Sequence, residues 1–193
     1  MQARAFKYAS PLIVYGMAWL AFTGNGWLTW LPMIYAWVLL PLVELFIHPD
    51  EKNLSAAEEE LAKQDRIYDY LLYSIVILQY LALFEFLRSM QNPQLLWWET
   101  AGRICSMGLL CGTFGINVAH ELGHRVNRYE QVFANALLLT SLYMHFFIEH
   151  NKGHHKNVAT PEDPGSARYN EPVYIFYFRT VIFSYISAWK IAN

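Results

Sequence analysis

Long apolar runs, separated by short polar segments, dominate the first 120 residues of the chain. A helix that crosses a membrane needs about 20 mostly apolar residues, and four runs are candidates: 11–22, 27–47, 67–86 and 104–119. The first run is short and ends at Thr23-Gly24-Asn25-Gly26, which is a turn signal. The first two runs can therefore form a tight hairpin. This pattern predicts an all-α integral membrane protein with about four transmembrane helices.

A polar segment, residues 48–66, separates the second run from the third. Ser55 lies three residues before Glu58, which is the spacing of a capping box. We therefore predict a short, solvated surface helix in this segment. His48 is interpreted as a histidine at the end of a span.

Two later segments are harder to assign. The apolar run 132–148 has histidines on both sides, and a crossing would separate these histidines by about 30 Å. If they serve one site, the run must lie along the membrane interface or dip into it, which is the interpretation we favour. The aromatic-rich segment 172–193 contains Arg179 and Lys190. A span and an interfacial amphipathic helix therefore both remain open for it.

Lysine and arginine are distributed unevenly between alternate loops. They precede the first run, fill the segment after the second, and follow the fourth at Arg125 and Arg128, whereas the opposite loops contain Arg88 and Arg103. Cytoplasmic loops are enriched in these residues. The N-terminus and the end of the fourth run are therefore predicted to face the cytoplasm, which makes the protein multi-pass.

The composition agrees with a membrane protein. Hydrophobic residues make up 55% of the chain and charged residues 16%, against about 25% charged residues in an ordinary soluble domain. A net charge of -2 argues against a nucleic-acid partner. Cys105 and Cys111 are six residues apart, on different faces of a helix, so no disulfide is expected between them. Residues 1–193 are interpreted as one membrane domain.

Six of the seven histidines lie between residues 120 and 155. His120 and His124 have the i,i+4 spacing that places both on one helical face, and His150 and His154 repeat it, with His155 adjacent. Ionisable residues at a membrane are costly and usually functional, so we interpret these five histidines as metal ligands. His145, outside this spacing, is expected to be buried or to support a ligand.

The first pair also matches the H-E-x-x-H motif of zinc proteases, with Glu121 as the general base. A catalytic zinc ion uses three protein ligands and an open position, so five histidines exceed what a protease needs. Imidazole also suits iron, and the apolar surroundings suggest an apolar substrate. The pattern favours a two-metal, all-histidine site that oxygenates a hydrophobic chain. A membrane zinc metalloprotease is the distant alternative.

The stretches HELGH, HFFIEHNKGHH and VATPEDPGSAR resemble the membrane alkane 1-monooxygenases, which belong to the fatty acid desaturase and hydroxylase superfamily. The resemblance implies two Fe ions, O₂ as co-substrate, and hydroxylation of the terminal methyl of medium-chain n-alkanes. It implies electrons from rubredoxin, which an NADH-dependent rubredoxin reductase reduces, and a place in the bacterial inner membrane, among membrane lipid, with the active site facing the cytoplasm. A xylene-type methyl monooxygenase or a fatty acyl desaturase is the close alternative.

The resemblance also assigns residues. It implies that the iron ligands include His120 and His124 from the first histidine box, and His150, His154 and His155 from the second. The later boxes of the family lie beyond a further span, and no histidine follows His155 here. The chain is therefore expected to be the N-terminal part of such a domain, with an incomplete ligand set.

Charged residues around the boxes have secondary interpretations. Ligating histidines usually donate their second ring N–H to a carboxylate or carbonyl, and four acids suit this work: Glu121, Glu149, Glu162 and Asp163. Arg168 is expected to pair with an acid of the same loop. Lys152, Lys156 and Arg125 either steer an acidic electron-transfer protein or follow the charge bias of membrane loops.

Overall fold

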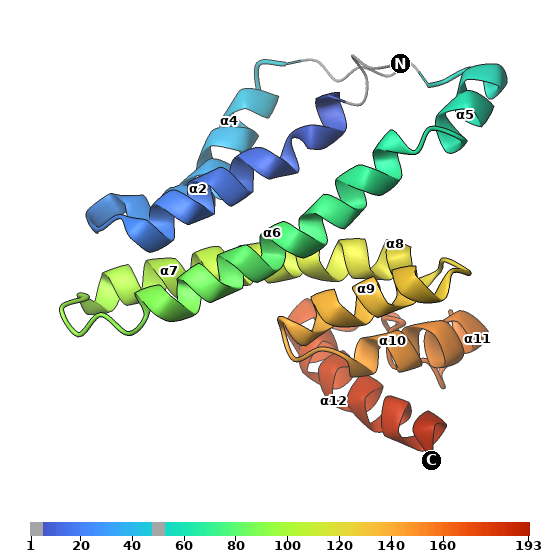
Figure 1. Cartoon of the computed structure of the whole chain (residues 1–193). Helices are drawn as coiled ribbons and strands as arrows, with labels where there is room; N and C mark the ends of the chain where they lie inside the picture. Colours follow the sequence, from blue (N-terminus) through green and yellow to red (C-terminus); the bar gives the residue numbers. More distant parts are fainter. Residues whose placement is uncertain (1–5, 48–52) are drawn as a thin grey trace. The chain divides into compact units, whose positions relative to one another are not determined.

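The computed structural model describes residues 6–47 and 53–193, and within these ranges it contains helices and no strand (Figure 1). The chain divides into two compact units, residues 1–115 and 116–193, and each is described by itself. The predicted all-helical fold is confirmed. The interpretation of 1–193 as one membrane domain stays a prediction. His48, expected at the end of a span, lies outside the described residues.

The first unit contains most of the apolar runs. In chain order its elements are η1 (Phe6–Ala9), α2 (Pro11–Thr23), η2 (Gly26–Trp30), α3 (Leu31–Ile34), η3 (Tyr35–Leu39), α4 (Leu40–Glu44), α5 (Ala56–Lys63), α6 (Ile67–Ser89), α7 (Trp97–Leu109) and η4 (Leu110–Ile116), whose last residue belongs to the second unit. η3 and η4 are π-helical, whereas η1 and η2 are 3₁₀ helices.

Two of the described helices are long and apolar enough to cross a membrane: the helical stretch Gly26–Glu44, from η2 to α4, and α6. Helix α2 is apolar but shorter. Large apolar side chains on both candidates are exposed, such as Trp37 and Phe84, each 68% exposed. Such surfaces suit a lipid environment, where apolar side chains face acyl chains. The prediction of four crossings stays a prediction.

The predicted turn between the first two apolar runs is confirmed. Helix α2 ends at Thr23, and Gly26 has a φ of +66°, a conformation that favours glycine. The Gly26 N–H donates to the Glu99 carboxylate over 2.5 Å, and the Arg103 guanidinium donates to the Gly24 carbonyl over 2.8 Å. α2 then packs against α3. The hairpin is therefore fastened to α7 by two buried charged side chains, Glu99 and Arg103.

Three side chains of this unit are linked by a series of hydrogen bonds. The Tyr15 hydroxyl donates to Gln79 over 2.6 Å, and the Gln79 amide lies 3.4 Å from the Cys111 sulfur. Cys105 and Cys111 are not joined in a disulfide, as predicted. The predicted surface helix is also present as α5, whose residues are almost all exposed and which begins with the expected capping box of Ser55 and Glu58.

We expect Gly102→Ala to loosen the first unit. A Cβ at Gly102 would lie 2.7 Å from Thr29 Oγ1 and 2.7 Å from Trp30 Nε1, so η2 must move away from α7. Overpacking of this kind costs about 1–3 kcal/mol, and the thermal unfolding midpoint in detergent should fall. Gly108→Ala, on the same helix, meets nothing within 4 Å and is the control. Equal midpoints for the two variants would contradict this packing.

The second unit contains the histidines. Its elements are α8 (Asn117–Gly123), α9 (Arg128–Leu139), α10 (His145–Glu149), η5 (His150–His154, π-helical), α11 (His155–Asn157) and α12 (Val173–Ala192). α8 packs against α9, and α10 packs against α12. Leu122, Leu137 and Leu138 are fully buried in its core.

The apolar run 132–148 is not one continuous helix. It is divided into α9 and α10 by residues 140–144, where Leu142 has a φ of +55°. The length of this run alone would suggest a transmembrane helix. Because the turn divides it, neither α9 nor α10 is long enough to cross a bilayer. The location of the run at the membrane interface stays a prediction.

Candidate metal centre

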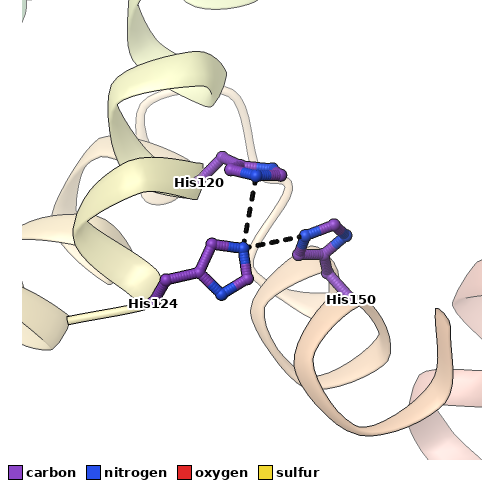
Figure 2. A group of neighbouring side chains, drawn as sticks. All are labelled: His120, His124 and His150. Carbon is purple, nitrogen blue, oxygen red and sulfur yellow. Dashed lines mark hydrogen bonds between the residues drawn. The ribbon is translucent and has the colours of Figure 1, made fainter. Parts of the chain in front are cut away.

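The two histidine boxes meet within the second unit. His120 lies in the last turn of α8 and His124 follows that helix, so their rings share one face as the i,i+4 spacing predicts. Their Nε2 atoms are 3.2 Å apart, and His124 Nε2 is 3.2 Å from His150 Nε2 (Figure 2). The ligand atoms of the three histidines all lie within 4.8 Å of one another. This spacing suits three donors to one metal ion.

The second box differs from the helical spacing that the sequence suggests. An α-helix would align His150 with His154, but η5 is a π-helix, in which residues five apart are aligned. His155 Nε2 accordingly lies 3.0 Å from His150 Nε2. His155 thus extends the group to four imidazoles with converging Nε2 atoms.

His154 has a different environment from the other four. Its Nδ1 lies 2.8 Å from the Asp163 carboxylate, and its ring stacks near that of His150 with centroids 5.3 Å apart. Held in this way at Nδ1, His154 has Nε2 as its remaining ring nitrogen. This is the arrangement that a carboxylate–histidine–metal triad requires.

The environments of two of these histidines, His120 and His150, favour the neutral imidazole. The pKa of His150 is lowered to about 4, first by burial and then by the neighbouring His120, His155 and His124. Burial, and then His124 and His155, also lowers the pKa of His120. A histidine binds metal only in its neutral form. Both rings are therefore ready to bind a cation at neutral pH.

Among the four acids expected to support the ligands, Asp163 is the one that contacts a histidine of the cluster. Its side chain is buried and accepts hydrogen bonds from the Gly165 N–H over 2.8 Å and from the Ser166 hydroxyl over 2.5 Å. Burial opposes ionisation, but these bonds and His154 outweigh it, so the pKa of Asp163 is lowered. Asp163 therefore stays a carboxylate.

The other three acids lie elsewhere. Glu121 accepts two hydrogen bonds from Arg125, at 3.1 and 3.2 Å, and Glu162 is exposed. Glu149 is buried, with its Oε1 lacking a hydrogen-bond partner, and burial followed by the charge of Asp163 raises its pKa. Glu121, the general base that the zinc-protease interpretation requires, is thus engaged in an ion pair with Arg125.

Two cavities lie beside the histidines in this unit. An apolar cavity of about 390 Å³ is lined by side chains that include Leu139, Met144, Ile148 and Trp189. A more polar cavity of about 200 Å³ reaches His150, His154 and Glu149. His145 lines both cavities, and its buried Nε2 has no hydrogen-bond partner. The residue as a whole is half-buried, so the expected burial is met only at this ring nitrogen, between an apolar space and the histidine cluster.

Sequence reasoning missed an ion pair beside Asp163. Arg168 was expected to pair with an acid of its loop, and its backbone N–H does donate to Glu171 over 3.0 Å. The main partner of Glu171 is Arg179 of α12, at 2.6 and 2.8 Å. The available signal was a single arginine in an aromatic, apolar segment, where a charge needs a partner.

The described residues form helices, two of which are long and apolar enough to cross a membrane, together with a histidine cluster suited to a metal. The family model described as "Fatty acid desaturase" matches residues 96–193, which is just over half of the chain. The chain therefore belongs to the fatty acid desaturase family.

Curated relatives give a narrower resemblance. Alkane 1-monooxygenase 1 of Alcanivorax borkumensis is 34% identical over 86% of this chain and 41% of its own length. Alkane 1-monooxygenase of Pseudomonas putida is 34% identical over 95% of this chain and 45% of its own length. The alkane 1-monooxygenase of Ectopseudomonas oleovorans is 35% identical over 94% of this chain and 44% of its own length. The resemblance to alkane 1-monooxygenases is confirmed, and the chain spans somewhat less than half the length of these relatives.

Proposed function

We propose that this chain forms part of a membrane monooxygenase that hydroxylates the terminal methyl of medium-chain n-alkanes with O₂. The observation that carries the proposal is the convergence of imidazole nitrogens from both histidine boxes in one folded unit. Relatives named alkane 1-monooxygenase, similar over most of the chain, support the reaction class.

The metal centre is proposed to be a di-iron site. His120, His124, His150 and His155 would hold metal through Nε2, and His154, oriented by Asp163, would add a further nitrogen. The donor set fits iron, because neutral imidazole is among its preferred ligands. When bound, iron supplies the activation of O₂ that side chains cannot provide. The protein's own task is to hold the rings, exclude water and admit the substrate.

An apolar substrate suits the surroundings of the cluster. The cavity lined by Leu139, Met144, Ile148 and Trp189 offers a mostly apolar surface. An alkane has no hydrogen-bonding group, so only shape and desolvation can hold it. His145, between this cavity and the cluster, would mark the passage of a terminal methyl towards the metals.

The partners and location follow the family resemblance. Electrons are proposed to come from rubredoxin and its NADH-dependent reductase, and the protein is proposed to lie in the bacterial inner membrane with the site facing the cytoplasm. The exposed Lys152 and Lys156, beside the histidines, fit the approach of an acidic donor.

A fatty acyl desaturase is the second candidate, favoured by the description of the matching family model. Both reactions need the same type of metal site, so the products must decide between them. The test uses the longest reading frame that contains this chain, produced with a rubredoxin and its reductase. n-Octane and a saturated fatty acyl substrate are supplied under ¹⁸O₂.

We expect ¹⁸O-labelled 1-octanol, detected by gas chromatography and mass spectrometry. A new double bond in the acyl substrate, without labelled alcohol, would move the assignment to desaturation. Protein that retains zinc without iron and cleaves peptides would overturn both candidates.

A further inference from the structure

The loop between α11 and α12 carries Asp163 against the ring of His154. This loop lies directly on the ring, because a Cβ added at Gly165 would come within 3.0 Å of His154 Nδ1 and 3.2 Å of Asp163 Oδ1. The Gly165 N–H and the Ser166 hydroxyl both donate to Asp163. The direction of the Asp163 carboxylate therefore depends on the path of residues 163–166.

One side chain of α12 binds this loop by two of its backbone carbonyls. The Arg179 guanidinium donates to the Pro164 carbonyl over 3.1 Å and to the Ser166 carbonyl over 2.8 Å. These two carbonyls flank Gly165. The same guanidinium donates two hydrogen bonds to the Glu171 carboxylate, of 2.6 and 2.8 Å. The Arg179 and Glu171 side chains are 11% and 7% exposed, so solvent screens the pair little.

We infer that Arg179 and Glu171 form a positioning pair that orients His154 for metal binding through the 163–166 loop and Asp163. The inference rests on the proposed metal centre and adds to it residues that neither histidine box contains. Glu171 orients the guanidinium, and the guanidinium holds the loop by its carbonyls. The loop in turn holds Asp163, and Asp163 holds Nδ1 of His154.

The chemistry of arginine makes this role specific. Its planar guanidinium presents donors in a fixed fork, whereas lysine offers a single rotatable ammonium. Arg179 uses this fork on one carboxylate and two carbonyls at once. The pKa of Glu171 is lowered to about 2, mainly by the hydrogen bonds from Arg179 and then from the Arg168 N–H. Glu171 therefore remains ionised at any pH at which the histidines bind metal.

The first measurement is the affinity for Co²⁺, an optical probe of imidazole sites. It uses the protein from the longest reading frame that contains this chain, purified in detergent. We expect Arg179→Gln to weaken binding by about 10–100-fold, the range typical when a partner of a ligating histidine is lost. Arg179→Lys should recover only part of this affinity. Lys190→Gln removes a cation from an exposed position on the same helix and should bind like the wild type.

A double mutant separates positioning from a general effect on the fold. If Arg179 acts through His154, Arg179→Gln should cause no further loss of affinity in a His154→Ala background, because the two changes interrupt the same connection. Losses that multiply in the double mutant would overturn the inference. So would wild-type affinity in Arg179→Gln.

A second readout follows the ring itself. In ¹⁵N-histidine spectra of the metal-free chain, His154 should show one fixed tautomer with the proton on Nδ1. Asp163→Asn and Arg179→Gln should both disturb this signal, while Lys190→Gln should leave it unchanged. An undisturbed His154 signal in Arg179→Gln would contradict the inference. Failure of the wild-type protein, from the longest reading frame, to bind Co²⁺ would instead count against the proposed metal centre.

Discussion

Replacing His150 by alanine is expected to remove the metal from the site and to abolish hydroxylation. His150 occupies the centre of the group, since its Nε2 lies 3.2 Å from that of His124 and 3.0 Å from that of His155. Its ring also stacks on Phe146, with centroids 4.7 Å apart and planes at 14°.

Loss of a side chain that supports a ligating histidine typically lowers metal affinity or activity by about 10–100-fold. His150→Ala should lower metal affinity by more, because it removes a ligand itself. Iron per chain, measured by elemental analysis after purification, should fall to a small fraction of the wild-type value, and 1-octanol formation should fall with it. Lys152→Gln, two residues away on η5 and exposed, is the control for metal content. Normal iron content and activity in His150→Ala would show that the histidine cluster is not the metal site.

Much of the site could be predicted from the sequence because it rests on local spacing. The i,i+4 pair His120 and His124 shares a face in any α-helix, so its geometry follows from two positions. The second box could not be predicted in the same way. Its π-helical turn aligns His150 with His155 instead of His154, and a π-helix depends on packing around it more than on a local sequence signal.

Contacts between residues far apart in the chain could not be predicted from the sequence either. Arg179 reaches back fifteen residues to Pro164, and no spacing rule connects an arginine in one helix to a carbonyl in a preceding loop. The turn at residues 140–144 was likewise not predictable from a sequence rule. Leucine rarely adopts a positive φ, so Leu142 gave no indication that the apolar run divides there. The hairpin at Gly26 was predictable, since glycine signals such a conformation.

Replacing Gly153 by alanine is expected to disturb the metal site without changing any proposed ligand. Gly153 is buried in η5, between His150 and His154. A Cβ at this position would lie 2.5 Å from Glu149 Oε1, 3.1 Å from Glu149 Cδ and 3.1 Å from Ile191 Cδ1. Glu149 is itself buried, so its carboxylate cannot swing into solvent, whereas the Ile191 contact is with the terminal carbon of a half-buried side chain.

The backbone of η5 must therefore shift, and both flanking histidines shift with it. Metal sites tolerate deviations of only about 0.2 Å in ligand distance, so the affinity for Co²⁺ should fall by about tenfold or more. Glu149→Ala provides the matched test, because it removes the carboxylate that the new methyl group meets. The double variant Gly153→Ala/Glu149→Ala should bind Co²⁺ as well as Glu149→Ala alone. If Gly153→Ala lowers affinity equally in both backgrounds, the clash with Glu149 is not the cause, and this account of the ligand geometry is wrong.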